Sequence, residues 1–309
     1  MLHYFPFSHN TYAMTMGLQP LGARPLIEID APLYGGELAQ KHALLNDDPC
    51  YYTQAMPGSE AAQWEALALV LHDLARHHPQ HCTLHIAGER WHWHNHLLGV
   101  DAEFCYGDAA TLPQAPLDWV GRQVQEDLLI LAGDHTAGFP LVAGQLCFAN
   151  MWCLDEKLGQ SFLAIHDPVP LFAAQLGRPS TLLMERLKLE RPVWRLNWSI
   201  VANNWLNLAS RFAEQNRQSK QHVTAANAGE RCFLRVERQG LARLPESGAV
   251  LFTIHTYLSA LAEECRDHDR AERILGTVRS IPPDVLAYKG IASFHDSLCT
   301  WLEHVWRPQ

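Results

Sequence analysis

The histidine of the segment FLAIHDPVPLF (162–172) has the residue type and the setting of a metal ligand. His166 follows the apolar run FLAI and precedes Pro168 and Pro170, which both restrict the backbone. A fixed backbone is what an axial ligand to a large planar cofactor requires, because the ring orientation sets the bond to iron. A structural histidine in the protein core explains the same residues. The segment by itself leaves both interpretations open.

The segment HWHNH (92–96) is the sharpest cluster of histidines in the chain. On a strand, His92, His94 and His96 alternate with tryptophan and asparagine, so all three imidazoles share one face. Histidines spaced in this way ligate zinc or iron when a third ligand comes from elsewhere. A hairpin with a polar outer face and tryptophans turned to the core gives the same alternation without any metal.

Charged side chains also lie on two predicted strands. In FLRVERQGLARLP (233–245), alternation gives Arg235, Glu237 and Gln239 one face of the strand, and Leu234, Val236 and Arg238 the other. The segment RLNWSI (195–200) similarly presents Arg195 and Asn197 on one face. Arginine is suited to the bidentate capture of a carboxylate. A solvated face with ion pairs between strands is the alternative.

Composition and charge exclude several classes of protein. With 309 residues, of which 48% are hydrophobic and 18% charged, the chain is long enough for one large domain or two ordinary ones and is not disordered. A formal charge of -9 argues against a general binder of nucleic acid or of anionic membranes. The 18 histidines favour a metal or cofactor site. No dinucleotide-binding, phosphate-binding or zinc-protease motif occurs.

The cysteines and the apolar runs predict a cytoplasmic protein with reduced thiols. The eight cysteines are scattered and form no CxxC pair, which disfavours a zinc ribbon or a thioredoxin motif. The first residues, MLHYFPFSHN, do not resemble a secretory signal. The longest apolar runs, such as ALALVL (66–71), are too short to span a bilayer.

Strands and helices are interspersed without a repeating βαβ pattern, which predicts an α+β fold around an antiparallel sheet, as one elaborated domain over 1–309. The expected helices cover Ser59 to Pro79, Asp118 to Gly133, 181–190, 267–278 and Asp284 to Val305. The expected strands cover a hairpin at 82–98 and the segments 138–149, 192–201, 232–241 and 249–258. The last two strands are predicted to pair antiparallel.

Five segments in a fixed order give the chain a resemblance to a known family. They are MTMGLQPL (14–21), VQEDLLIL (124–131), DEKLGQSFLAIHDPVP (155–170), RPVWRLNWSI (191–200) and LRVERQGLARLPESGAVLFTIHTYL (234–258). Together they resemble the haem-dependent oxidative N-demethylase alpha-subunit family over about residues 11–260. The helical region from about 261 to 309 then stands as a C-terminal extension.

The resemblance implies a PAS-like antiparallel sheet, enlarged by flanking helices, that holds b-type haem. It implies a monooxygenase type of reaction, in which a small amine is oxidised with O2 and loses an N-methyl group as formaldehyde. Electrons would come from an external NAD(P)H-dependent flavin and iron–sulfur reductase, a separate partner protein. No nucleic acid and no membrane are expected as partners, and the sequence leaves open whether the chain forms oligomers.

The resemblance also suggests roles for individual residues. His166 is the choice for the axial ligand of the haem iron, and Lys157, Arg235 and Arg238 are candidates for the haem propionates. Glu237 is expected to hold an ammonium substrate or to relay protons, and Asn197 is the second candidate catalytic residue.

The chain departs from the pattern of this family at two places. The segment CFANMW (147–152) replaces a more usual Phe-Pro-Ser type of stretch, and His255 stands where arginine is expected. These departures predict a reshaped pocket, so the substrate need not be a simple methylamine.

Two other classes of function stay open. A PAS-like haem protein also serves as a gas or redox sensor, in which ligand binding shifts a partner without turnover. A non-haem metal enzyme would use His92, His94 and His96.

Overall fold

The computed structural model describes residues 1–306 and has an α+β fold, as predicted. The helices are α1 (Ala31–Asp47), α2 (Pro49–Tyr52), α3 (Glu60–His77), α4 (Pro116–Gly121), α5 (Phe162–His166), α6 (Arg178–Arg186), α7 (Ala213–Gln221), α8 (Ala228–Arg231), α9 (Leu261–Glu264), α10 (His268–Arg279), α11 (Pro283–Tyr288) and α12 (His295–Trp306). Short 3-10 turns lie at Ala109–Thr111 (η1), Leu154–Glu156 (η2), Ser210–Phe212 (η4) and Ala292–Phe294 (η5), and a π-helical turn lies at Ala173–Gly177 (η3).

Within residues 1–306, ten strands form two antiparallel sheets. They are β1 (Gln19–Pro20), β2 (Thr53–Ala55), β3 (Cys82–Ala87), β4 (Arg90–Asn95), β5 (Val100–Cys105), β6 (Asp127–Leu131), β7 (Leu141–Gln145), β8 (Val193–Val201), β9 (Phe233–Arg243) and β10 (Val250–Ala260). The large sheet has the order β1-β8-β9-β10-β6-β7-β2, and the small sheet has the order β3-β4-β5.

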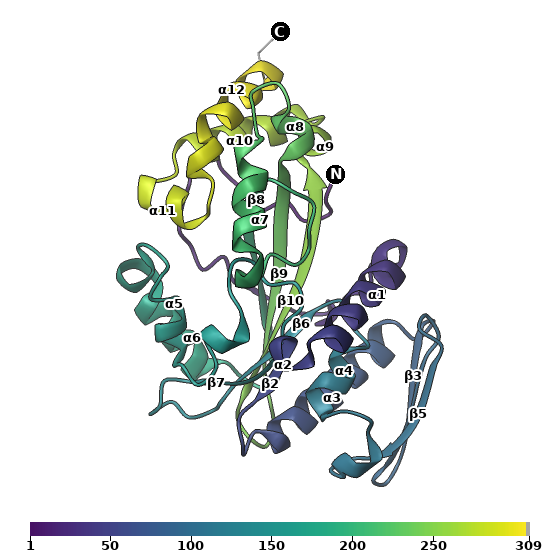
Figure 1. Cartoon of the computed structure of the whole chain (residues 1–309). Coiled ribbons are helices and arrows are strands. Elements are labelled where there is room, and N and C mark those ends of the chain that lie inside the picture. The colour runs from purple at the N-terminus through teal and green to yellow at the C-terminus, as the bar shows by residue number, and fades with distance from the viewer. Residues whose placement is uncertain (307–309) are drawn as a thin grey trace.

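The long strands of the large sheet organise the molecule. In Figure 1, β8, β9 and β10 run through the centre, with α10, α11 and α12 near one end and α5 and α6 beside the sheet. The small sheet lies with α3 and α4 at the opposite end. The predicted antiparallel pairing of the last two strands is confirmed, since β9 and β10 pair from Phe233↔Ala260 to Arg243↔Val250.

One hydrophobic core joins the sheet to the C-terminal helices. This cluster contains residues as far apart in the chain as Tyr4, Leu234 and Leu302. A second cluster, which includes Leu154, Met184 and Leu241, packs beneath α5 and α6. The description of the large sheet as PAS-like and of the chain as one domain stay predictions.

The predicted helix from Asp118 to Gly133 is wrong. Only α4 is helical there, and Asp127–Leu131 form β6, which lies between β10 and β7. All five residues of β6 are buried. A continuous apolar run of this length suits a central strand covered on both faces, and the spacing of Val120, Val124 and Leu128 fits a helix equally well.

Other predicted elements differ from the structure at their ends. The hairpin at 82–98 is confirmed as β3 and β4, joined at Gly88 with φ +65°, and β5 adds a third strand that the sequence did not predict. The helix predicted from Asp284 to Val305 is divided, because Gly290 with φ +66° ends the helical path after α11. No helix within residues 1–306 is both long and apolar enough to cross a membrane.

One face of the large sheet buries an ion pair at His255. Its Nδ1 lies 3.0 Å from an oxygen of Glu126, both side chains are almost fully buried, and the ring stacks on Tyr257. Burial lowers the pKa of His255, but the carboxylate of Glu126, with Glu28 and Glu37 acting in the same direction, raises it overall. Burial likewise raises the pKa of Glu126, and His255 outweighs that effect and lowers it.

The pair makes stability depend on pH in two directions. The contribution of His255 is present below the ordinary histidine pKa of about 6.5 and is lost as the pH rises through its raised folded pKa. The contribution of Glu126 is present above the ordinary glutamate pKa of about 4.3 and is lost as the pH falls through its lowered folded pKa.

We therefore expect the free energy of unfolding to fall above neutral pH in the wild type. The variant His255→Arg keeps its positive charge to pH 12, so this part of the alkaline loss, about 1.4 kcal/mol for each unit of the pKa shift, disappears. Denaturant titrations between pH 5 and 10 measure the slope, with the exposed His222→Arg as a matched control. Equal slopes for wild type and His255→Arg would contradict this account.

Candidate functional site

The other face of the large sheet carries a polar group centred on Glu237. In the cross-strand register, Glu237 of β9 lies between two neighbours: Asn197 of β8 is opposite it on one side, and Thr256 of β10 is opposite it on the other. Directly opposed residues of an antiparallel sheet point to the same face. The predicted alternation along β9 is confirmed, because Leu234 and Val236 lie in the apolar core while Arg235 and Gln239 contact Glu237.

Three donors fix the Glu237 carboxylate, which is itself nearly buried. Asn197 Nδ2 and Gln239 Nε2 each donate to Oε2 at 3.1 Å, and Arg235 Nε donates to Oε1 at 3.4 Å. A carboxylate held in this way keeps one orientation and is ready to receive a further donor or cation. Asn197, predicted as a catalytic residue, is therefore in direct contact with Glu237.

His166 is the last residue of the short helix α5. Ser161 begins this helix by accepting a hydrogen bond from the Ala164 N–H, and Pro168, which has no N–H, follows just after it ends. The ring stacks on Phe172 with centroids 4.4 Å apart and also contacts Phe162. The prolines therefore act at a helix end rather than in an extended segment after a strand.

The imidazole of His166 is held in one tautomer. Its Nδ1 donates to the Phe162 carbonyl at 2.7 Å, and within residues 1–306 its Nε2 has no hydrogen-bond partner. Burial lowers the pKa of His166 to about 4, and the charges of Lys157 and Arg195 act in the same direction. The ring is therefore neutral near pH 7, with the Nε2 lone pair free to bind.

Lys157 lies close to the helix end that carries His166. Its Nζ donates to the Ile165 carbonyl at 2.7 Å and lies 5.3 Å from the centre of the Trp152 ring. Burial lowers the pKa of this ammonium group. Lys157 keeps donors free beyond the one that contacts the backbone.

The guanidinium groups of Arg235 and Arg238 both form hydrogen bonds within the protein. Arg235 is fully buried and donates to the carbonyls of Leu206 and Phe148, to Thr256 and to Glu237. Its side chain shares the face of Glu237, but it serves to tie loops to the sheet.

Arg238 lies on the opposite face, together with His255, its neighbour in the register. It donates to the carbonyls of Leu26 and Pro25, and its Nε lies 3.3 Å from Glu28. The structure thus brings His166, Lys157, Asn197, Arg235 and Glu237 to one side of the sheet and leaves Arg238 on the other.

The two departures from the family pattern also fall on different faces. His255 does not reach the face of Glu237, since its strand neighbour Thr256 takes that face. The segment 147–152 does border it, because Asn150 donates to Ser199 of β8. Only the second departure therefore adjoins the site.

Two residues near Glu237 were missed by the sequence reasoning. The carboxylate of Glu237 raises the pKa of Tyr288 together with burial, which is the larger cause. Burial lowers the pKa of Lys289 to about 8, and Glu237 opposes that shift. Tyr288 is the last residue of α11, and Lys289 follows it. Both lie in the C-terminal region that the resemblance did not cover, so no motif pointed to them.

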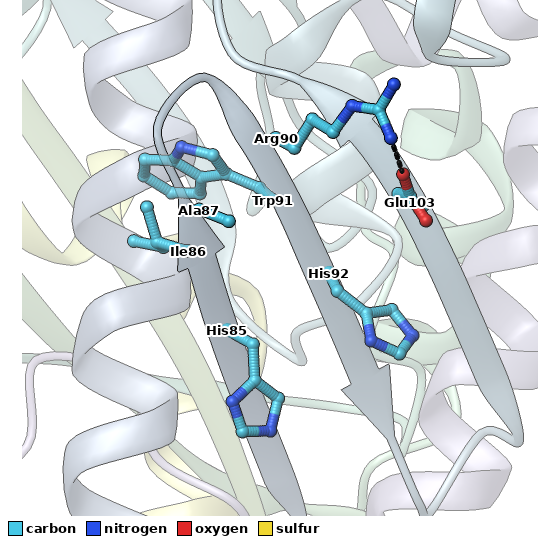
Figure 2. A pocket seen from close by; sticks show the side chains of 7 residues that line it. All are labelled: His85, Ile86, Ala87, Arg90, Trp91, His92 and Glu103. Atoms are coloured by element: carbon cyan, nitrogen blue, oxygen red, sulfur yellow. Dashed lines mark ion pairs between the residues drawn. The ribbon is translucent and has the colours of Figure 1, made fainter.

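The three histidines of HWHNH lie on the outer face of the small sheet. Trp91 and Trp93 are buried behind them. A hollow of about 220 Å³ lies along this hairpin. Figure 2 shows side chains that line it, among them His85, His92 and Glu103. His92 contacts the exposed Asp101 and thereby lowers its pKa. Across the described part of the chain, no three histidine, cysteine or acidic side chains converge to hold a metal ion.

Comparison with known families gives a match to almost the whole chain. The family model described as HODM_asu-like, haem-dependent oxidative N-demethylase, alpha subunit-like, matches residues 17–299. The match therefore extends past residue 260 and takes in α11, which carries Tyr288 and is followed at once by Lys289.

The structural role of Arg235 is open to a direct test. The variant Arg235→Met should lower the free energy of unfolding by about 3 kcal/mol or more, because buried carbonyls and Glu237 lose their donor. Chemical denaturation measures the change. The matched control Arg217→Met breaks an exposed pair with Glu214 and should cost about 1 kcal/mol at most. Wild-type stability of Arg235→Met, with weakened cofactor binding, would instead favour a role at the propionates.

Proposed function

Because the chain belongs to the haem-dependent oxidative N-demethylase alpha-subunit-like family, we propose that it is a haem-dependent oxidoreductase that removes an N-methyl group from a small amine. The observation that carries the proposal is His166, whose ring is neutral, oriented and free at Nε2 on the side of the sheet that holds Glu237. The description alpha-subunit-like also names one component of an assembly of several subunits.

The residues around His166 fit b-type haem. The iron needs a neutral imidazole whose second nitrogen is already engaged, and Nδ1 of His166 donates to a backbone carbonyl. Phe162 and Phe172 offer apolar surface beside the ring. Arg195, whose buried Nε has no hydrogen-bond partner among residues 1–306, offers positive charge for an acidic group.

Haem bound there would supply oxygen activation: amine, O2, two electrons and two protons would give the demethylated amine, formaldehyde and water. We propose that the electrons come from a separate NAD(P)H-dependent flavin and iron–sulfur reductase. Within residues 1–306, this chain's own contribution is to hold the cofactor, exclude water with apolar side chains and place the amine.

Glu237 is the proposed binding group for the ammonium of the amine. Its carboxylate is fixed by Asn197 and Gln239, so it can receive a cationic amine without first reorganising. Deprotonating that ammonium would place its proton on Glu237. Asn197 acts on the substrate through Glu237, whose orientation it fixes.

Binding of haem is tested by the optical spectrum. Purified protein supplied with haem should show a strong Soret band. The variant His166→Ala should weaken haem binding by about 100-fold or more, because even the loss of an outer-shell partner costs about 10- to 100-fold. The matched variant His94→Ala, on the outer face of the small sheet, should bind haem as the wild type does. Absence of a Soret band, with zinc or iron retained instead, would contradict the proposal and favour the non-haem alternative.

Turnover is tested by oxygen uptake that depends on an added amine in the presence of a reductase, scored by formaldehyde release. The variant Glu237→Gln should raise KM for the amine, because it removes the charge but keeps the shape of the side chain. A haem-loaded protein that takes up no oxygen and releases no formaldehyde with any amine would favour the sensor alternative.

A further inference from the structure

Arg195 of β8 is an arginine without a partner. Its Nε is buried and makes no hydrogen bond, and no hydrogen bond or ion pair joins its guanidinium to any other residue within 1–306. Two other arginines on the same face of the sheet, both in β9, are engaged. Arg235 donates to Leu206, and Arg243 donates to the carbonyls of Leu187 and Gly248.

An unpartnered donor in this position is costly. The Arg195 side chain is half-buried, and its buried Nε–H has left water without a replacement contact, beside a permanent positive charge. Burial lowers the pKa of Arg195, and only the Glu237 carboxylate opposes that shift. The free protein therefore holds a charge that an anion would stabilise.

Glu237 does not serve as the anionic partner of Arg195. Asn197, Gln239 and Arg235 donate to its two oxygens, and its distance to Arg195 exceeds that of an ion pair. A second cation, Lys289, donates to the Trp198 carbonyl at 2.6 Å, and the charge of Arg195 helps to lower its pKa. Around Arg195 the positive groups thus exceed the negative ones.

His166 gives the direction from which an anion would arrive. Arg195 lies opposite Gln239 on the face of the sheet against which Phe162 and Ile165 of α5 pack, and its charge contributes to the low pKa of His166. An anionic group bound beside His166 on this face would therefore approach Arg195.

We propose that Arg195 binds a carboxylate group in the site that His166 and Glu237 form. The inference rests on the proposed function and deepens it. The carboxylate belongs either to a haem propionate or to an amine substrate of the N-methyl amino acid class. Arginine suits both, because its planar fork donates two parallel hydrogen bonds to a carboxylate.

The first experiment compares haem with haem dimethyl ester, whose propionates carry no charge. Soret titrations give both affinities for wild type, for Arg195→Gln and for the exposed control Arg191→Gln. For a propionate, Arg195→Gln should bind haem about 10- to 100-fold more weakly, the range of a hydrogen bond between charged groups, and should bind the ester as the wild type does.

The second experiment tests the substrate as the source of the carboxylate. N-methylglycine and dimethylamine are titrated into the haem-loaded protein and followed by the Soret shift. If Arg195 binds the substrate, Arg195→Gln should lose affinity for N-methylglycine by a similar factor and keep its affinity for dimethylamine. The proposal is overturned if Arg195→Gln keeps the wild-type ratio of affinities in both comparisons, haem against its dimethyl ester and N-methylglycine against dimethylamine.

A third measurement separates ligand binding from a structural role. In the haem-free protein, Arg195→Gln should unfold at a higher denaturant concentration than wild type, because it removes a half-buried charge whose buried Nε–H has no partner. A structural arginine would give the opposite shift, and that result would overturn the proposal. Arg195→Lys, which keeps the charge but loses the fork, should bind the carboxylate with intermediate affinity.

Failure of the haem proposal can be told apart from failure of this one. If the wild type binds neither haem nor its ester, the proposed function fails. Titration calorimetry of the haem-free protein with N-methylglycine then still tests Arg195. Binding that is lost in Arg195→Gln and kept in Arg191→Gln supports the carboxylate site, and no binding by the wild type overturns it.

Discussion

The ladder between β9 and β10 is the constraint on which the rest of the structure depends. It pairs the two strands over their full length, from Phe233↔Ala260 to Arg243↔Val250, and β8 adds a third long strand to it. Side chains alternate between faces with a period of two, so a slip of one residue would move Glu237 into the apolar core beside Leu234 and Val236. The cost of burying such charges without partners fixes the register, and the register decides which residues share a site.

The two faces of this sheet differ in whether their charged side chains are paired. On one face the charges are paired within the protein: His255 meets Glu126, and Arg238 lies against Glu28. On the other face the carboxylate of Glu237 accepts from three donors, while the guanidinium of Arg195 has no acceptor among residues 1–306. A paired group stabilises the fold, whereas an unpaired one lowers stability until a ligand meets it. This difference is the reason that we propose the second face, and not the first, as the one that receives ligands.

The face that we propose to bind ligands is assembled from segments that are distant in the chain. His166 comes from a five-residue helix, Arg195 and Asn197 from β8, Glu237 from β9, and Lys289 from the residue after α11. The large sheet and the second hydrophobic cluster hold these segments in place. Because Lys289 reaches back to the Trp198 carbonyl of β8, the C-terminal region belongs to the architecture of the site.

The sequence by itself determined the long strands, their antiparallel pairing, the α+β class and the family, because these follow from local alternation and from ordered motifs. It also placed Arg235, Glu237 and Gln239 on one face, which needs only the period of a strand. It misjudged Asp127–Leu131, since an apolar run has the same pattern in a buried strand and in a buried helix. Only the tertiary structure decided which arginines are engaged: Arg235 and Arg238 meet carbonyls from remote loops, and Arg195 meets none. Hydrogen-bond partners that lie far apart in the chain leave no local signal, which is why the sequence could propose the arginines and could not choose among them.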